Sequence, residues 1–268
     1  MNVWKSECGA MELRLGDYRE VLCDVTAVDC VLTDPPFSAK THAGHDAGAG
    51  IANKMNRPTS GPAEGFGARS ELSYASWSHT EIARLAAFFS TRCAGWMVAL
   101  SDSILCADYR AQFELVGLTG FHPLPCVIPG MTVRMAGDGP SSWAVYANVA
   151  RPKALHKWGT LPGAYICKPG ERGYIGGKPL ELMRALVRDY SQPDDLVCDP
   201  CAGSGTTLLA AAQLGRRAIG AEVDGDAFDR AILRLSQPYT VDLFVPRETR
   251  SPEQLGLDLF ADESMGEV

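Results

Sequence analysis

The tetrapeptide DPPF, Asp34 to Phe37, combines residue types that can hold a planar ring carrying an amino group. The Asp34 carboxylate and the backbone carbonyl of Pro35 can each accept one amino hydrogen, so that the nitrogen lone pair can point at an electrophile. Pro35 and Pro36 fix φ and lack an amide hydrogen, which stiffens the turn. The Phe37 ring offers a stacking face, worth about 1–3 kcal/mol for a nucleic-acid base. The motif predicts a clamp for an extruded base, although a plain turn with an aromatic cap explains it equally well.

A second candidate site is the glycine-rich stretch DPCAGSGTT, which follows a short apolar run and precedes a helical pattern. Gly203 and Gly205 permit a sharp turn and a close backbone approach to a ligand. Glu222 ends the next expected strand, where a carboxylate can bind the hydroxyls of a ribose. The pattern therefore predicts a nucleoside cofactor. The residues assigned to this site are Asp199, Pro200, Cys201, Ala202, Gly203, Ser204, Gly205, Thr206, Thr207, Glu222 and Val223.

Three details favour one cofactor over its alternatives. Leu208 stands where a dinucleotide fingerprint has its third glycine, and no GxxxxGK[ST] motif is present, so NAD and a P-loop nucleotide are both disfavoured. Asp199 opens the loop, and an acid suits a cationic amino-acid tail better than a pyrophosphate. We therefore expect S-adenosylmethionine, with NAD and a loop that merely turns the chain as alternatives.

Strands and helices alternate along the chain, which predicts a Rossmann-like, doubly wound, mostly parallel α/β sheet. The apolar patterns predict strands at 11–15, 28–33, 95–100, 142–149, 196–198 and 217–223, and helices at 18–23, 78–91, 103–116, 179–190, 206–213 and 226–235. We expect a catalytic domain over residues 1–240, with a long mobile loop at 38–77, a basic region at 121–178 that is loop-like outside its one strand, and a flexible acidic tail at 241–268.

The 268 residues are 46% hydrophobic and 21% charged, as in ordinary globular proteins. The nine cysteines and the absence of an apolar leader or membrane-length run favour a reduced, cytoplasmic protein. Cys198 and Cys201 form a CxxC pair, but no second cysteine or histidine pair stands at zinc spacing, and no further ligands accompany His42 and His45, so no metal is expected. The net charge of -7 hides a basic region of seven cations and two acids at 121–178, which can serve an anionic partner.

Taken together, the two motifs resemble those of the DNA amino-methyltransferases of the β arrangement, in which the catalytic tetrapeptide precedes the cofactor loop. LRLGDYREVL with VDCVLTDPPF is similar to the family's opening, and the stretch from YIGGKPLEL to IGAEVD is similar to its closing half. The resemblance implies that Asp17 contacts the cofactor adenine. It also places Lys178 at a cofactor-binding position, although Gly177 replaces the usual Gln there. DPPF favours N6 of adenine, with N4 of cytosine as the alternative.

Duplex DNA is the partner that this resemblance implies, with the protein associated with the nucleoid. Candidate DNA-contacting cations are Lys40, Arg57, Arg134, Arg151, Lys153 and Lys157. Gln254 to Phe260 (QLGLDLF) resembles the peptide with which bacterial proteins bind the DNA sliding clamp. The rival interpretations are a non-catalytic DNA- or clamp-binding module and an NAD oxidoreductase. The recognition sequence, a restriction partner and a homodimer stay open.

Overall fold

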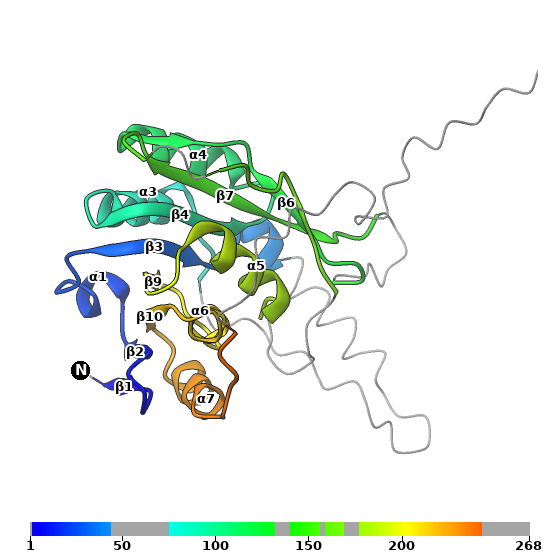
Figure 1. Ribbon diagram of the computed structural model, residues 1–268. Coiled ribbons are helices and arrows are strands. Elements are labelled where there is room, and N and C mark those ends of the chain that lie inside the picture. The colour runs from blue at the N-terminus through cyan, green and yellow to red at the C-terminus, as the bar shows by residue number, and fades with distance from the viewer. Residues whose placement is uncertain (1, 44–74, 132–139, 156–158, 169–176, 243–268) are drawn as a thin grey trace, which may run out of the picture.

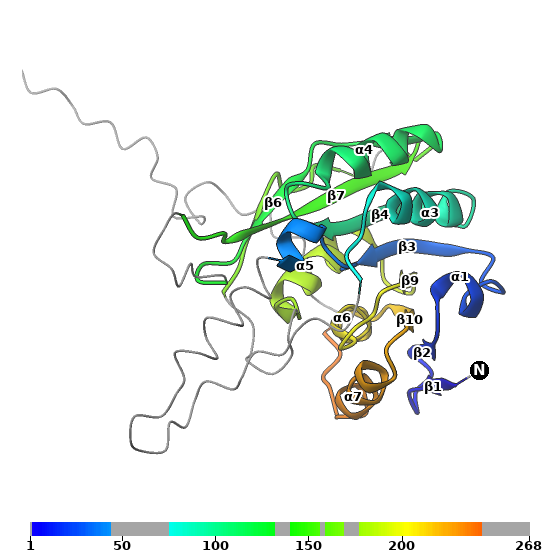
Figure 2. The same ribbon diagram turned by 180° about the vertical axis from the view of Figure 1, so that it is seen from behind.

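The computed structural model describes residues 2–43, 75–131, 140–155, 159–168 and 177–242. A central sheet carries helices on both faces (Figures 1 and 2). The strands are β1 (Val3–Lys5), β2 (Met11–Leu15), β3 (Val28–Thr33), β4 (Cys93–Ser101), β5 (Leu118–Gly120), β6 (Leu124–Val127), β7 (Ala144–Pro152), β8 (Tyr165–Ile166), β9 (Leu196–Asp199) and β10 (Arg217–Glu222). The helices are α1 (Tyr18–Val21), α3 (His79–Phe89), α4 (Cys106–Leu115), α5 (Leu180–Tyr190), α6 (Thr206–Gln213) and α7 (Gly225–Leu235).

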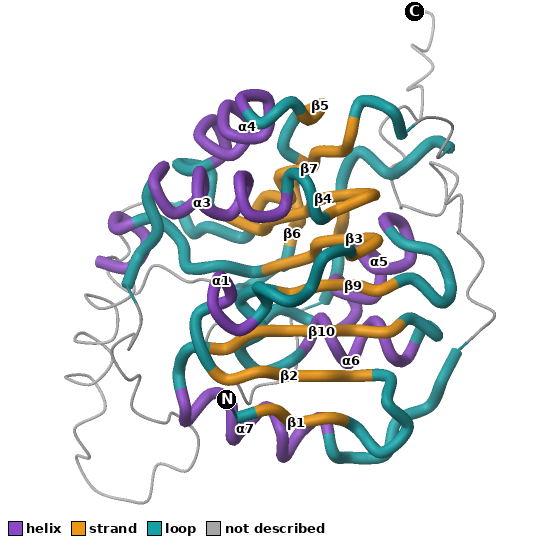
Figure 3. Tube along the Cα trace, turned by 90° about the vertical axis from the view of Figure 1, so that its left-hand side faces the viewer, coloured by secondary structure: helices purple, strands orange, loops and turns teal. Residues whose placement is uncertain are grey.

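The sheet has a parallel centre and antiparallel flanks. Its strand order is β1-β2-β10-β9-β3-β4-β7-β6-β8, with β5 paired to β7 (Figure 3). The five strands from β2 to β4 in this order run parallel, whereas β1 and β7 run antiparallel to their neighbours. The predicted doubly wound, mostly parallel fold is confirmed, and β9, from the last third of the chain, lies directly beside β3.

Two apolar cores lie on opposite faces of this sheet, because successive side chains of a strand point to opposite sides. Leu32 of β3 packs in the core that contains Leu186 of α5. Its neighbour Val31 packs in the other core with Phe89 of α3. Figure 3 shows the same division, with α1, α3 and α4 on one side of the strands and α5 and α6 on the other. Covering both faces leaves the strand ends as the accessible edges of the sheet.

The basic region differs from expectation, because the prediction that it is loop-like outside one strand is wrong. Its described residues also form β6 and β8, and β6 pairs with β7 on one side and β8 on the other. These strands are short, and β6 contains Pro125 and a single buried residue, Cys126. Pairing with the long β7 stabilises β6, and pairing with β6 stabilises β8. Local sequence carries little trace of such tertiary pairing.

The remaining predicted elements are present within a few residues of their expected ends, and β1 and β5 are additional short strands. Helix α3 begins with a capping box, in which Ser78 and Glu81 exchange hydrogen bonds with each other's backbone. Within the described ranges, no helix has the length and apolar character that crossing a membrane requires.

Candidate functional site

The DPPF motif and the glycine loop meet at the carboxyl edge of the sheet. β3 leads directly into Asp34, β9 ends at Asp199, and the two strands pair in parallel with Val31 opposite Cys198. Thr33 Oγ1 donates a 2.7 Å hydrogen bond to Asp199 Oδ1, although the two residues are 166 positions apart. Ligands of open α/β sheets bind at this edge. The structure thus brings together the two motifs that the sequence separates.

The Lys178 side chain lies beside both the Asp34 carboxylate and the Phe37 ring. Lys178 Nζ lies 2.7 Å from Asp34 Oδ2 and 4.6 Å from the centroid of the Phe37 ring. The other carboxylate oxygen, Oδ1, is buried and has no hydrogen-bond partner among the described residues. Burial raises the pKa of Asp34, and the nearby Lys178 ammonium opposes that rise. The carboxylate is therefore poised to accept a hydrogen or a proton from a ligand.

The glycine loop turns sharply into α6. Gly203 and Gly205 adopt φ of 51° and 74°, in the left-handed region that favours glycine. A Cβ on Gly205 would lie 2.8 Å from Leu235 Cδ1, so a side chain is excluded there by packing as well as by backbone conformation. Gly205 directly precedes the first residue of α6, and the helix therefore presents its amino end to the same edge as Asp199.

Asp199 is a buried acid in a partly compensated environment. Its side chain is 1% exposed, and burial raises its pKa to about 6. Hydrogen bonds from Thr207 and Thr33 lower the pKa, whereas the charge of Asp34 raises it. An acid with this pKa gains free energy when a cation binds beside it, because the cation favours the ionised form. The environment therefore suits a cationic ligand group.

Glu222 and its neighbours form the far end of the site. Glu222 accepts hydrogen bonds from the amide of Gly203 (2.7 Å) and from the amide of Asp224 (2.8 Å), and its carbonyl accepts one from Gly16 (2.7 Å). Burial raises its pKa. Val223 is 69% exposed, so this edge presents an apolar surface beside a carboxylate. That pairing fits a nucleoside, which has a flat base and a hydroxylated sugar.

Asp17 lies next to Gly16 at the same edge and caps α1. Its carboxylate accepts a hydrogen bond from the amide of Arg19 and forms a 2.6 Å ion pair with the Arg19 guanidinium. The hydrogen bond from this guanidinium lowers the pKa of Asp17. The structure thus places Asp17 near Glu222, but its carboxylate already has a cationic partner.

Sequence reasoning missed three residues that organise the site. Thr33 connects the two motifs. Asp102, just after β4, accepts hydrogen bonds from Ser38 and Thr41 and so fixes the chain that follows Phe37. Arg234 of α7 donates to Ser204 and to Thr206 Oγ1 at 2.7 Å. Only Asp102 carried a usable signal, since an acid that follows an apolar strand lies at the ligand edge of such a sheet.

The predicted DNA-contacting cations separate into three groups. Lys40 is exposed in the helical turn at 39–43, directly after the DPPF motif. Arg151 and Lys153 lie toward the opposite edge, because β7 runs antiparallel to β4 and Ala150 pairs with Met97. The Arg151 guanidinium stacks there at 5.7 Å from the centre of the Phe121 ring. The other three, Arg57, Arg134 and Lys157, lie outside the described residues, as do most of the expected 38–77 loop and the tail from residue 243 onward.

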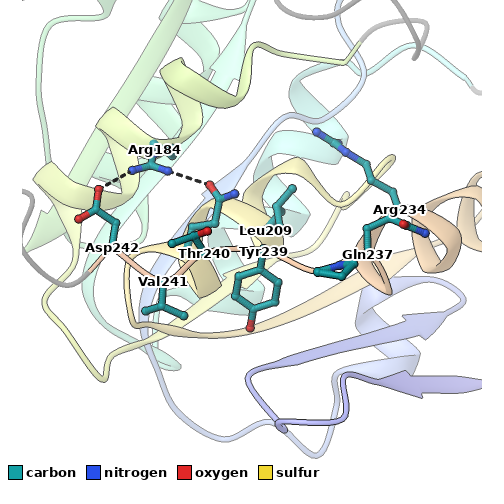
Figure 4. A pocket seen from close by; sticks show the side chains of 10 residues that line it. Arg184, Leu209, Arg234, Gln237, Tyr239, Thr240, Val241 and Asp242 are labelled. Atoms are coloured by element: carbon teal, nitrogen blue, oxygen red, sulfur yellow. Dashed lines mark hydrogen bonds and ion pairs between the residues drawn. The ribbon is translucent and has the colours of Figure 1, made fainter.

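A separate pocket is lined by residues of α5, α6 and α7 and of the segment that follows α7 (Figure 4). Arg184 crosses it, donating to Gln213 at 3.0 Å and to Asp242 at 3.1 Å. Its lining includes no residue of the DPPF motif or the glycine loop, and Arg234 connects it to Ser204. The pocket is therefore distinct from the candidate site at the sheet edge.

The sheet order and the two motifs at its carboxyl edge define a Rossmann-like, class I methyltransferase fold. The solved M1.HpyAVI–SAM complex superposes with a TM-score of 0.60 at 20% identity, over 84% of this chain and 99% of that one. The PvuII DNA methyltransferase, described as cytosine-N4-specific, superposes with a TM-score of 0.59 at 15% identity, over 94% and 91%. At these identities the likeness concerns the fold.

Sequence comparison finds similarity to one family over part of the chain. Residues 146–232 match the DNA methylase family of N6 and N4 methyltransferases. The type II methyltransferase M.HindIII of Haemophilus influenzae is 44% identical over 66 residues, which cover 24% of this chain and 21% of that protein. The chain therefore spans about a fifth to a quarter of the curated relatives that it matches. Over these stretches the matches support the predicted resemblance to the DNA amino-methyltransferases.

Proposed function

We propose that this protein is an S-adenosylmethionine-dependent DNA methyltransferase that methylates N6 of adenine in a specific duplex site after base flipping. The observation that carries the proposal is the juxtaposition of Asp34 and Asp199, which end adjacent parallel strands and are linked through Thr33. One acid stands in a motif suited to an aromatic amine, and the other opens a loop suited to a cationic nucleoside cofactor. A methyl donor and a methyl acceptor would thus share one sheet edge.

The chain fits the cofactor on three counts. The buried Asp199 carboxylate lacks a full counter-charge and suits the amino group of the methionine part. Glu222 suits the ribose hydroxyls, and the exposed Val223 suits a face of the adenine. Gly203 provides room, because a Cβ built there would meet no atom within 4 Å. When bound, S-adenosylmethionine supplies an electrophilic methyl group on a sulfonium.

The catalytic groups act by position and electrostatics. Asp34 Oδ1 and the carbonyl of Pro35 would accept the two hydrogens of the target amino group, directing the nitrogen lone pair out of the ring plane. The cofactor would supply the methyl group and its sulfur would keep the electron pair of the broken bond, so the methylated nitrogen would become cationic. Asp34 then stands ready to take the surplus proton, which its raised pKa favours.

DNA would approach along the flank of the sheet that follows β4. The register of β7 places Tyr146 opposite Ser101, close to the catalytic edge. Trp143 and Ile166 are exposed at the same end, at 48% and 52%. Exposed aromatic and apolar side chains beside the edge suit contact with bases, while Lys40 suits a phosphate. We therefore assign target recognition to the 121–178 region, and activity to the nucleoid in the cytoplasm.

The test is incubation of mixed genomic DNA with methyl-labelled S-adenosylmethionine, followed by nucleoside analysis and mapping of the modified positions. We expect label in N6-methyladenine at one short sequence. Label in N4-methylcytosine would change the assigned target base from adenine to cytosine and leave the rest of the mechanism intact. Cofactor binding without label in any DNA would instead favour a non-catalytic module and refute the proposal.

The peptide Gln254–Phe260 lies outside the described residues, and its resemblance to clamp-binding peptides is the support for a further partner. We propose that it tethers the enzyme to the bacterial sliding clamp. A chain ending at Arg250 should methylate short oligonucleotides at the full rate and lose clamp binding in a pull-down. Unchanged clamp binding would refute the assignment.

A further inference from the structure

Lys178 contacts the two side chains, those of Asp34 and Phe37, that would hold the target base. Its ammonium donates to Asp34 Oδ2 at 2.7 Å, as the amino group of a base would donate to this carboxylate. It also lies 4.6 Å from the centre of the Phe37 ring, where a base would stack. The lysine and Asp34 are 144 positions apart, so the fold itself creates this arrangement.

Two further observations indicate that the arrangement anticipates a ligand. Asp34 Oδ1 is buried and has no partner among the described residues, and leaving a buried acceptor unsatisfied costs about 1–3 kcal/mol. The Lys178 side chain is only 10% exposed, so it fills the site rather than extending into solvent. The carboxylate thus has one oxygen held by the lysine and one held open for a second donor.

We propose that Lys178 is a positioning residue that occupies the base site in the absence of DNA, keeps Asp34 ionised, and leaves the Phe37 ring when the flipped base enters. This inference rests on the proposed function. A ring face that carries an ammonium within a cation–π distance cannot at the same time carry a stacked base, so the two states exclude each other.

The exchange also changes the electrostatics of the reaction. Among the described residues, Asp34 interacts electrostatically with four titratable groups, those of Lys178, Asp199, Cys201 and Tyr109. Lys178 is the only cation among these four. When the neutral amino group of the base takes its place, no nearby positive charge balances the negative charge of the Asp34 carboxylate. Asp34 then attracts positive charge most strongly when the methylated nitrogen becomes cationic, which stabilises the transition state more than the bound base.

The experiment compares the wild-type protein with Lys178→Met, Lys178→Gln and Lys178→Arg. Lys5→Met is the matched control, because Lys5 forms a 3.0 Å pair with Glu12 at the far edge of the sheet. Folding is checked by thermal denaturation and by S-adenosylmethionine binding. The first readout is the ionisation midpoint of Asp34, from ¹³C NMR of carboxyl-labelled aspartate without DNA, assigned with Asp34→Asn.

For the neutral variants we expect the Asp34 midpoint to rise by about 1–2 pH units, because an adjacent opposite charge lowers a carboxyl pKa by about that amount. Lys178→Arg should restore the wild-type midpoint, and Lys5→Met should not move it. The acid limb of the kcat/KM profile for DNA should shift in the same direction. Equal midpoints in the wild type and both neutral variants would overturn the inference.

The second readout is base flipping, followed by the fluorescence of 2-aminopurine placed at the mapped target position. At a pH above both midpoints, the neutral variants should reach half-maximal signal at a DNA concentration lower by about threefold or more, since no ammonium competes for the ring. Unchanged or weaker flipping in both neutral variants would overturn the proposed exchange. A wild-type protein that labels no DNA would refute the proposed function, whereas an unmoved midpoint in an active enzyme would refute the role of Lys178 alone.

Discussion

The hydrogen bond from Thr33 to Asp199 should set the pH range in which the cofactor binds. Thr33 is fully buried, and its hydroxyl donates to the Asp199 carboxylate at 2.7 Å. Replacing Thr33 with Val keeps the shape of the side chain and removes this donor. The other influences on Asp199, which are the hydroxyl of Thr207, the amide of Cys201 and the charge of Asp34, are retained.

The size of the effect follows from the hydrogen bond and the pKa. A hydrogen bond to a charged group contributes about 1.5–3 kcal/mol, and 1.36 kcal/mol corresponds to one pKa unit, so the Asp199 pKa should rise by about 1–2 units. The wild-type pKa is about 6, so Asp199 is mostly ionised at pH 7. In Thr33→Val, half or less is ionised at that pH. The dissociation constant for S-adenosylmethionine should therefore be about twofold to tenfold larger than in the wild type at pH 7.

The assay is calorimetric titration of both proteins with S-adenosylmethionine between pH 5 and 9. The ratio of the two dissociation constants should be near one at pH 9, where both carboxylates are ionised, and should rise steadily as the pH falls to 5, toward the limit set by the difference between the two pKa values. Thr41→Val, which removes a hydroxyl from the Asp102 carboxylate instead, is the control and should give a ratio near one throughout. A Thr33→Val ratio that does not change with pH would show that this hydroxyl does not tune Asp199.

Three further outcomes are expected. Asp34→Ala should abolish methyl transfer and change cofactor affinity less than about twofold, as measured by single-turnover labelling and calorimetry; equal loss of both would contradict its assignment to the base. Asp199→Asn should raise the free energy of unfolding of the cofactor-free protein by up to about 3 kcal/mol at pH 7, because the folded pKa of about 6 exceeds the ordinary aspartate pKa of 3.8. Because the pKa of Asp199 is raised, the contribution of this acid to the free energy of unfolding falls as the pH rises from about 4 to 6. The gain from Asp199→Asn, measured by denaturant titration, should therefore vanish near pH 4. A gain that does not change with pH would contradict the explanation by a buried charge. Gly205→Ala should destabilise the protein more than Gly9→Ala. Both glycines have positive φ, but of the two only Gly205 would place a Cβ against Leu235. Equal decreases in the melting temperature would show that the loop or Leu235 moves to make room for the Cβ.

The sequence predicted the parallel centre of the sheet well, because β3 and β10 are continuous apolar runs whose side chains are buried on both faces. It also predicted which residues stand at strand ends, since the end of an apolar run marks the edge of the sheet. The sharing of one edge by Asp34 and Asp199 depends on the pairing of β9 with β3. Periodicity alone does not contain that pairing.

The interactions within the site could not be predicted from the sequence, for a physical reason. The contact between Lys178 and Asp34 depends on how the start of α5 packs against the end of β3, and neither residue has a local pattern that reveals the other. The same applies to Arg234, which reads as an ordinary cation on an amphipathic helix but donates to Ser204 and Thr206. Short strands such as β8 likewise exist only because a neighbour offers free backbone groups.

The pairing of β2 with β10 has a consequence for how such a chain can be assembled. The earliest long strand and the latest strand of the sheet are hydrogen-bonded neighbours, from Met11 beside Ala218 to Leu15 beside Glu222. Which strands pair in the sheet therefore does not depend on the order in which the segments are synthesised. A cyclically rearranged gene, encoding the cofactor half first, would specify the same set of strand neighbours, so the order of motifs along a chain records its ancestry and not the geometry of its reaction.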